Sequence, residues 1–210
     1  MSDASAAGAF ALGFALGAAP GPVQVLILSE TAKRGLAGGL RVMLGANLTL
    51  LAILVVLALG FASVEPGPGV LRALRIVGGA FLVWLGVTEL RSIRRDAAVD
   101  PRVAGTTVRL GPTAKGSVSV LLNPGAWIFF ATTASAVIVN ATTRGGTSEA
   151  VVVVVAMAIG VSCSDLTFTV LGSGGRRLFG DRGLRWIRMA LAGLLIAIGV
   201  GFVWQGATGG

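Results

Sequence analysis

Asp165 is the residue of this chain whose type and position are best suited to chemistry. It ends the sequence Ser162-Cys163-Ser164-Asp165, well inside a long apolar run. A charged aspartate at the centre of a membrane helix costs about 2.5–3.5 kcal/mol on insertion scales, so such a residue is usually functional and faces the protein interior. It could hold a substrate amine, take a coupling proton, or alternate between the two. The alternative is a packing residue that is protonated or hydrogen bonded to a serine.

Helix-breaking residues interrupt two other apolar runs, at Pro20-Gly21-Pro22 and at Asn123-Pro124-Gly125. Proline suits the first position of a helix and asparagine is a good N-cap, so each run is predicted to break and restart here. The first break has no capping side chain, because Ala18 and Ala19 precede it. Two half-helix N-termini that face each other attract an anionic group such as a carboxylate. The alternative is a pair of simple proline kinks.

Three further side chains are candidates for the wall of a substrate site. Asn47 lies in an apolar run of the first half, Gln24 one turn past the first break, and Trp127 one turn past Pro124. For the two amides, hydrogen bonding between helices is an equally good interpretation. Asp165 is the predicted site of proton coupling. The predicted substrate-binding residues are Pro20, Gly21, Pro22, Gln24, Asn47, Asn123, Pro124, Gly125, Trp127 and Asp165.

The composition places the chain in a membrane and excludes several classes of function. Hydrophobic residues make up 54% of the chain and charged residues 12%, against about 25% charged residues in soluble domains. The chain has no histidine, which removes histidine-ligated metals and serine–histidine triads. We therefore predict a protein that is not an enzyme and has neither a cofactor nor a resident metal.

Six segments are long and apolar enough to cross a bilayer, which takes roughly 20 residues each. Most of the 17 basic residues lie in three of the gaps between these segments. The positive-inside rule then places those gaps in the cytoplasm and both termini outside. The net charge of +8 is accordingly interpreted as anchoring to the lipid bilayer, and no nucleic-acid partner is expected. The predicted spans are 6–29, 40–62, 70–90, 116–138, 149–171 and 186–205.

An internal repeat predicts how these spans are arranged. The segment Arg72–Gly86 aligns with Arg185–Gly199, and both begin with Arg-x-x-Arg and end in glycine. Because three spans are an odd number, the two halves must cross the membrane in opposite directions. The alternative is chance similarity between two apolar helices. The predicted fold is an all-α integral membrane protein with six transmembrane helices as two inverted three-helix repeats, at 1–92 and 115–210, joined by a cytoplasmic linker at 93–114.

The remaining acids and glycines have simpler interpretations. Glu30 and Glu89 are expected near the cytoplasmic ends of spans, where charge costs little. There they should pair with Lys33, Arg34 or Arg91 more readily than with a ligand. Glycines at four-residue spacing let helices approach closely. They are expected to pack within one chain, with a homodimer as the alternative, and the stripe consists of Gly13, Gly17 and Gly21.

Taken together, the ordered motifs resemble the lysine exporter (LysE/RhtB) family of bacterial amino-acid exporters. The resemblance covers nearly the whole chain and implies six spans in a bacterial inner membrane, export of an amino acid or a close derivative, and drive by the proton gradient. The family usually has a lysine or a similar polar residue after Asn-Pro, where this chain has Gly125. If that side chain handles substrate or protons, the substrate of this chain differs from the typical one. The matching features are Pro20-Gly21-Pro22, Arg34-Gly35 with Gly38-Gly39 and Gly45, the segment 78–86, Leu122-Asn123-Pro124 and the aspartate of the fifth span.

The sequence therefore predicts an exporter of an amino acid or amino-acid-like small solute, working by proton antiport with alternating access. Two alternatives remain. A metal-cation exporter of the same architecture would have few hard ligands beyond Asp165 for an ion that takes six or more oxygens. An intramembrane enzyme would need a nucleophile with a base, or paired acids, inside the membrane.

Overall fold

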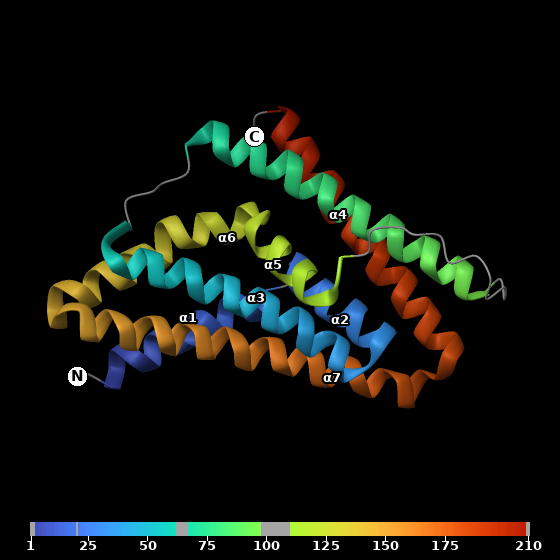
Figure 1. Ribbon diagram of the computed structural model, residues 1–210, viewed down its shortest axis with the longest axis horizontal. Coiled ribbons are helices and arrows are strands. Elements are labelled where there is room, and N and C mark those ends of the chain that lie inside the picture. The colour runs from blue at the N-terminus through green and yellow to red at the C-terminus, as the bar shows by residue number, and fades with distance from the viewer. Residues whose placement is uncertain (1–2, 20, 62–66, 98–109, 209–210) are drawn as a thin grey trace.

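Every regular element in the described part of the chain is a helix, as predicted (Figure 1). The computed structural model describes the chain except for residues 1–2, 20, 62–66, 98–109 and 209–210. Pro20 therefore lies outside the described residues. The elements are α1 (Asp3–Ala18), α2 (Pro22–Arg34), α3 (Leu36–Val56), the π-helix η1 (Leu57–Phe61), α4 (Pro68–Ala97), α5 (Pro112–Leu121), α6 (Pro124–Phe129), the π-helix η2 (Phe130–Ala134) and α7 (Ser135–Thr208).

Proline sets the start of four of these helices: α2, α4, α5 and α6 begin at Pro22, Pro68, Pro112 and Pro124. A proline at the first helical position loses nothing, because its missing N–H would have had no partner inside the helix. Two of these starts lie within predicted spans. The prediction that both apolar runs break and restart is therefore confirmed. The axes of α1 and α2 differ by 65° across the first break.

Four segments have the length and apolar composition of a membrane span: Leu36–Leu59, Pro68–Arg94, Pro124–Gly174 and Arg182–Thr208. The bent pair α1 and α2 makes a fifth if it crosses as one broken span. The chain is thus a multi-pass membrane protein. α4 continues to Ala97, a few residues into the segment predicted as a linker.

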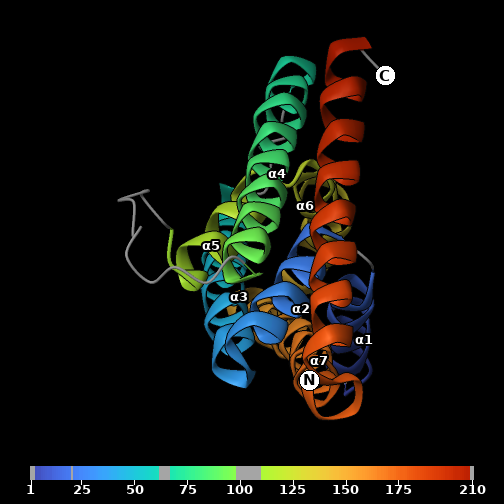
Figure 2. The same ribbon diagram turned by 90° about the vertical axis from the view of Figure 1, so that its right-hand side faces the viewer.

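Glycines divide the long α7 into three stretches. Gly145 (φ −139°, ψ 17°), Gly146 (φ 67°) and Gly180 (φ 59°) leave helical geometry. Positive φ is a region that glycine enters freely and most other residues avoid. The chain doubles back at the first of these breaks and turns again at the second, which lays the last stretch of α7 along α4 (Figures 1 and 2).

Close helix contacts within the chain depend on glycine. A Cβ atom at Gly13 would overlap the carbonyl of Met157, and one at Gly17 would press on Ser164, both in α7. The interpretation of these two glycines as packing within one chain is confirmed. Gly21, the third member of the predicted stripe, instead caps α2.

Glycines of α4, α5 and the last stretch of α7 make close helix contacts of the same kind. A Cβ at Gly116 of α5 would overlap the carbonyl of Val42 in α3. Where α4 meets the last stretch of α7, Gly86 packs on the carbonyl of Ala192 and Gly199 on the carbonyl of Gly79. Small residues allow such backbone contact between membrane helices.

Large apolar side chains cover much of the outside of the bundle, and its mainly apolar interior also holds several polar side chains. Leu59 is 67% exposed and Trp204 70%, whereas the interior holds Gln24, Asp165 and Thr169 together with apolar residues such as Leu54 and Met157. A soluble protein rarely exposes so much contiguous apolar surface. This arrangement suits a protein whose outer faces contact lipid.

Candidate functional site

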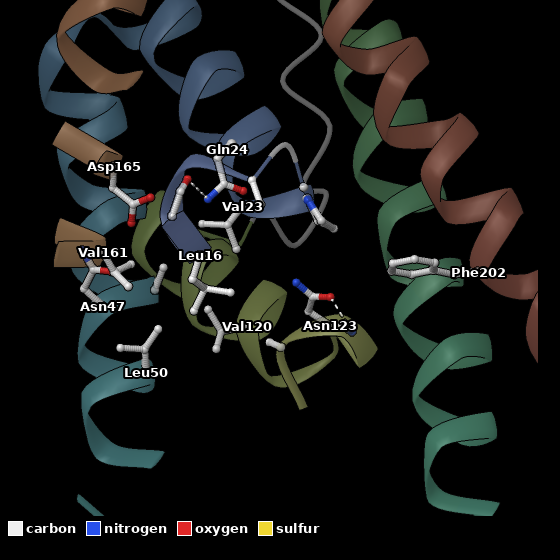
Figure 3. A pocket seen from close by; sticks show the side chains of 17 residues that line it. Leu16, Val23, Gln24, Asn47, Leu50, Val120, Asn123, Val161, Asp165 and Phe202 are labelled. Carbon is white, nitrogen blue, oxygen red and sulfur yellow. Dashed lines mark hydrogen bonds between the residues drawn. The ribbon is translucent and has the colours of Figure 1, made fainter. Parts of the chain in front are cut away.

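A cavity of about 330 Å³ lies where the two helix breaks meet α3 and α7 (Figure 3). This volume is at the lower end of the range for small-molecule sites, about 300–1,000 Å³. The cavity brings together seven of the predicted residues, which come from four separate parts of the chain: Gly21, Pro22, Gln24, Asn47, Asn123, Gly125 and Asp165. Pro124 and Trp127 do not line it.

The break between α1 and α2 leaves its helix start open. Gly21 has extended backbone (φ −154°, ψ −177°) and provides no side-chain cap. Its carbonyl accepts from Val25 N at 3.1 Å. The N–H groups of Val23 and Gln24 have no hydrogen-bond acceptor among the residues that the structure describes, as is usual in the first turn of a helix without a capping side chain. The open N–H groups and the positive end of the helix dipole favour an anion at this position.

The break between α5 and α6 is closed by its own cap. The Asn123 side-chain oxygen accepts from Gly125 N at 3.0 Å. The Asn123 carbonyl oxygen accepts from Ala126 N at 3.1 Å and Trp127 N at 3.3 Å. The predicted cap by Asn123 is thereby confirmed. The first N–H groups of α6 already have acceptors.

At each break, a side chain of the second helix bonds back to the first. Gln24 Nε2 donates to the Gly17 carbonyl at 2.8 Å, and Trp127 Nε1 donates to the Leu121 carbonyl at 2.7 Å. Both acceptors are in the last turn of a helix, where carbonyls lack intrahelical donors. Gln24 also lines the cavity, whereas Trp127 does not.

Asp165 faces the cavity from α7 with its carboxylate unpaired. The residue is 1% exposed, and neither carboxylate oxygen has a hydrogen-bond partner among the residues that the structure describes. A buried charge without a partner is strongly unfavourable. Among the described residues no serine donates to this carboxylate, so the alternative of a packing residue remains only in its protonated form. Figure 3 shows Asp165 and Asn47 on one side of the cavity, with Gln24 projecting from α2.

Asn47 has a hydrogen-bond partner for only one of its two polar side-chain atoms among the described residues. Its Nδ2 donates to Ser162 Oγ of α7 at 3.2 Å, while its Oδ1 is buried without a partner among the described residues. The hydrogen bond joins two helices, as one of the sequence interpretations proposed. The unpaired oxygen leaves an acceptor available in the cavity wall.

The rest of the lining is apolar and was not predicted. It includes Leu16, Leu50, Val120, Val161 and Phe202. Leu50 lies one turn beyond Asn47, and Val161 one turn before Asp165, so helical periodicity from those two candidates could have found them. Phe202 reaches the site from the last stretch of α7, and no local sequence signal indicates this contact.

Glu30 and Glu89 differ from their prediction in burial. The expected ion pairs with Arg34 and Lys33 are present, but the expectation of a position where charge costs little is wrong. Glu30 is 2% exposed and Glu89 7%. Both are buried because distant cations, Lys115 and Arg188, pack against them.

The described residues contain no group of three or more His, Cys, Asp or Glu side chains placed to hold a metal ion. Among the described residues that line the cavity, Asp165 alone has a charged side chain. The cavity therefore offers one carboxylate, several amide groups, an open helix start and an apolar wall.

The family model described as LysE type translocator matches residues 14–206. An uncharacterized membrane protein of Pseudomonas aeruginosa is 32% identical over 115 residues, which cover 53% of each chain. Cysteine/O-acetylserine efflux proteins of Salmonella paratyphi A and Salmonella typhi are each 30% identical over 93 residues, or 44% of this chain and 48% of theirs. The chain thus spans about half the length of the curated relatives it matches. No solved structure matches it significantly.

The match to the family model extends over most of the chain, including both helix breaks and every described residue that lines the cavity. Proteins of this family are transporters and not enzymes. Because the match is this extensive, the chain belongs to the LysE type translocator family.

Proposed function

We propose that this chain exports an amino acid or amino-acid-like small solute from the bacterial cytoplasm by proton antiport, with alternating access to the cavity. The observation that carries the proposal is the buried, unpaired carboxylate of Asp165 in a cavity bordered by an open helix start. These features are complementary to the two ends of a zwitterion. The efflux activity in the names of the Salmonella relatives supports the direction of transport.

In this proposal the two charged ends of the substrate bind on different elements. The ammonium group pairs with Asp165, because an unpaired buried carboxylate gains most from a cation. The carboxylate accepts from the open N–H groups at the start of α2, near Val23 and Gln24. The start of α6 contributes less, since Asn123 already occupies its N–H groups.

The apolar wall favours a small, uncharged substrate side chain. Leu16, Leu50, Val120 and Phe202 offer no partner for a second charge, and burying an unpaired charge is costly. Cysteine and O-acetylserine, named for the Salmonella relatives, carry side chains of this kind. We therefore expect neutral amino acids to be preferred over lysine.

Alternating access would follow from six spans in two inverted repeats. The glycine contacts support this arrangement. Gly13 packs on Met157 in the same way as Gly116 packs on Val42, and Gly160 packs on Phe10 in the same way as Gly45 packs on Thr113. The corresponding residues are also equally spaced along the chain. Gly13 and Gly116 are as many residues apart as Phe10 and Thr113 are. Val42 and Met157 are as many residues apart as Gly45 and Gly160 are.

The contacts between α4 and the last stretch of α7 support the same symmetry. Gly86 and Gly199 are aligned in the repeat. Gly86 packs on the carbonyl of Ala192, and Gly199 packs on the carbonyl of Gly79, which is the residue aligned with Ala192. The break at Gly145 and Gly146 would divide Pro124–Gly174 into two spans. With α1 and α2 as one broken span, the total would be six, and the basic loops would then face the cytoplasm with both termini outside.

Asp165 would also carry the coupled proton, because one carboxylate cannot hold an ammonium group and a proton at the same time. Competition for this side chain would exchange substrate for proton across the membrane. A potential of 100 mV moves one charge with about 2.3 kcal/mol, which is roughly a fifty-fold concentration ratio. One proton per substrate is enough for useful export.

Counterflow in proteoliposomes tests this function. Purified protein would be assayed with radiolabelled cysteine, O-acetylserine, threonine and lysine, and with divalent metals, with and without a pH gradient. We expect counterflow of neutral amino acids and its loss in Asp165→Asn, with Glu149→Gln as a control far from the cavity. Gradient-driven uptake by Asp165→Asn at the rate of the unmodified protein would contradict the coupling role. Counterflow of metals without counterflow of amino acids would contradict the proposed substrate and indicate a metal-cation exporter.

A further inference from the structure

Two buried carboxylates outside the cavity are each held between cations from different helices. Both lie at the end of the bundle where α2 finishes and α3 begins. We call this group the ion cluster, and it consists of Glu30, Lys33, Arg34, Glu89, Ser92, Lys115 and Arg188.

The first half of the ion cluster joins α2 to α5. Glu30 of α2 is 2% exposed, and its Oε2 lies 2.9 Å from Nε of Arg34, one turn along the same helix. Its other oxygen, Oε1, pairs with Lys115 of α5. The pair between Glu30 and Lys115 links the first half of the chain to the second.

The other half of the ion cluster joins three helices. Glu89 Oε2 of α4 lies 2.8 Å from Lys33 Nζ of α2. Arg188 of α7 donates to Glu89 Oε1 from Nε at 2.9 Å and from Nη2 at 2.7 Å. Ser92 accepts from Lys33 Nζ at 2.8 Å and from Arg188 Nη2 at 3.1 Å, and its hydroxyl lies 3.4 Å from Glu89 Oε2. Glu89 thus also connects the two halves of the chain.

The ion cluster lies directly beyond the cavity. α2 begins at the cavity with Pro22, Val23 and Gln24 and ends in the cluster with Glu30 and Lys33. At 1.5 Å per residue, Gln24 and Lys33 are about 13 Å apart along the helix. None of the cluster residues is among the described residues that line the cavity. The cluster therefore lies between the cavity and the end of the bundle that carries Lys33, Arg34 and Lys115, an end that the positive-inside rule assigns to the cytoplasm.

We propose that Glu30 and Glu89 are gating residues, whose ion pairs hold the cytoplasmic side of the cavity closed and separate when the cavity opens to the cytoplasm. This inference rests on the proposed alternating access. The pairs Glu30–Lys115 and Glu89–Arg188 each join the first half of the chain to the second, and these halves would move relative to each other. Neither carboxylate contacts the cavity, so their role in transport is to set which side is open.

Ion pairs suit a contact that must form and separate in each cycle. In the closed state, mutual attraction offsets the loss of hydration, and in the open state water hydrates both groups again. The net difference for a buried pair is therefore small, unlike that for an apolar core contact. Removing one partner upsets this balance, because the closed state then buries a charge without compensation.

Accessibility of a cavity thiol tests the gate without any substrate. In a Cys163→Ser background, Ala46→Cys places a thiol in the cavity lining. Its labelling by a membrane-impermeant maleimide is measured in inside-out vesicles, where the cytoplasmic face is outermost. We expect Glu89→Gln and Glu30→Gln to raise the labelling rate by on the order of tenfold, since each removes the carboxylate charge that two cations share in the closed state. In right-side-out vesicles the rate should fall.

Two matched variants separate gating from general loosening. Glu89→Asp keeps the charge and should stay near the parent rate, and Glu149→Gln makes the same change as Glu30→Gln far from the ion cluster. Elution as a single folded species in detergent checks each protein. If one glutamate variant does not fold, Lys115→Gln and Lys33→Gln test the same pairs from the other side.

Unchanged labelling in folded variants of both pairs would overturn the gate, as would an equal rise in Glu149→Gln. The readout needs no transport. A protein that gates but exports no amino acid would contradict the proposed function alone. A protein that exports amino acids but shows no change in labelling would contradict the gate alone.

Discussion

The two helix breaks at the cavity have the same order of parts but differ in what their N–H groups bond to. Each has a proline at the first helical position and a side chain that bonds back to the preceding helix, Gln24 at one break and Trp127 at the other. At the second break, the backbone and side chain of Asn123 occupy the first N–H groups of α6. At the first, Gly21 leaves those of α2 open.

This difference teaches that related packing does not imply related binding. The glycine contacts treat the two halves alike, whereas the caps do not. A helix start can bind an anion only if its N–H groups are not already bonded within the chain. In the proposed function the substrate carboxylate therefore binds on the α2 side of the cavity, and the α6 break has the more structural role of the two.

The largest expected effect tests the likeness of the halves. In Gly13→Ala and Gly116→Ala, the new methyl group would meet the backbone carbonyl of Met157 or Val42. A backbone carbonyl cannot relieve the overlap by changing rotamer as a side chain can. Each variant should therefore lose about 3 kcal/mol of stability or fail to fold. Thermal unfolding in detergent measures this.

Gly193→Ala provides the control for both glycine variants, because a Cβ there meets nothing within 4 Å. It should unfold at the parent temperature or slightly above it, since alanine has the higher helix propensity. If only one of the two packing variants is destabilised, the halves are less alike than their contacts indicate.

The next effect tests the difference between the breaks. Gly21→Asn gives α2 the kind of cap that α6 has. Its Cβ would lie 3.3 Å from Oε1 of Gln24, so the end of that side chain must shift by a few tenths of an ångström. The new cap would compete with the substrate carboxylate for the same N–H groups. A hydrogen bond to a charged group contributes about 1.5–3 kcal/mol, so the substrate concentration for half-maximal counterflow should rise roughly tenfold or more.

Gly21→Ala adds the same first carbon atom without a capping group. We expect its half-maximal concentration to stay within about threefold of the parent, because helix caps act through the polar side-chain atom. An equal loss of affinity in the alanine and asparagine variants would point to crowding, and the carboxylate would then have to bind elsewhere in the cavity.

Local chemistry explains which parts of this site could be predicted from the sequence. A proline break, the capping residue before it and an acid inside an apolar run all act on their own helix, so Asn123, Pro22 and the burial of Asp165 could be anticipated. The cations on Glu30 and Glu89 come from helices distant in the sequence, as does Phe202 in the cavity wall. Their positions depend on how the helices pack, which the residues near each glutamate do not specify.

Trp127 shows a second limit of local reasoning. Its place one turn past Pro124 suggested the cavity, yet its ring nitrogen bonds to the free carbonyl of Leu121. The sequence does not indicate that this carbonyl lacks a partner, because the exact end of α5 depends on the break itself. The apolar ring alone therefore could not show which way the side chain turns.

The smallest expected effect concerns the capped break. Asn123→Ala removes one hydrogen bond, to Gly125 N, while the residue's carbonyl still accepts from Ala126 and Trp127. Loss of such a cap costs about 1 kcal/mol, so the unfolding temperature should fall by a few degrees. The substrate concentration for half-maximal counterflow should hardly change, since only one N–H group is freed. Asn123→Ser, which can still cap, should restore most of the stability. If Asn123→Ala instead weakens binding as strongly as Gly21→Asn, the α6 start contacts the substrate as closely as the α2 start does, and the two breaks are functional equals.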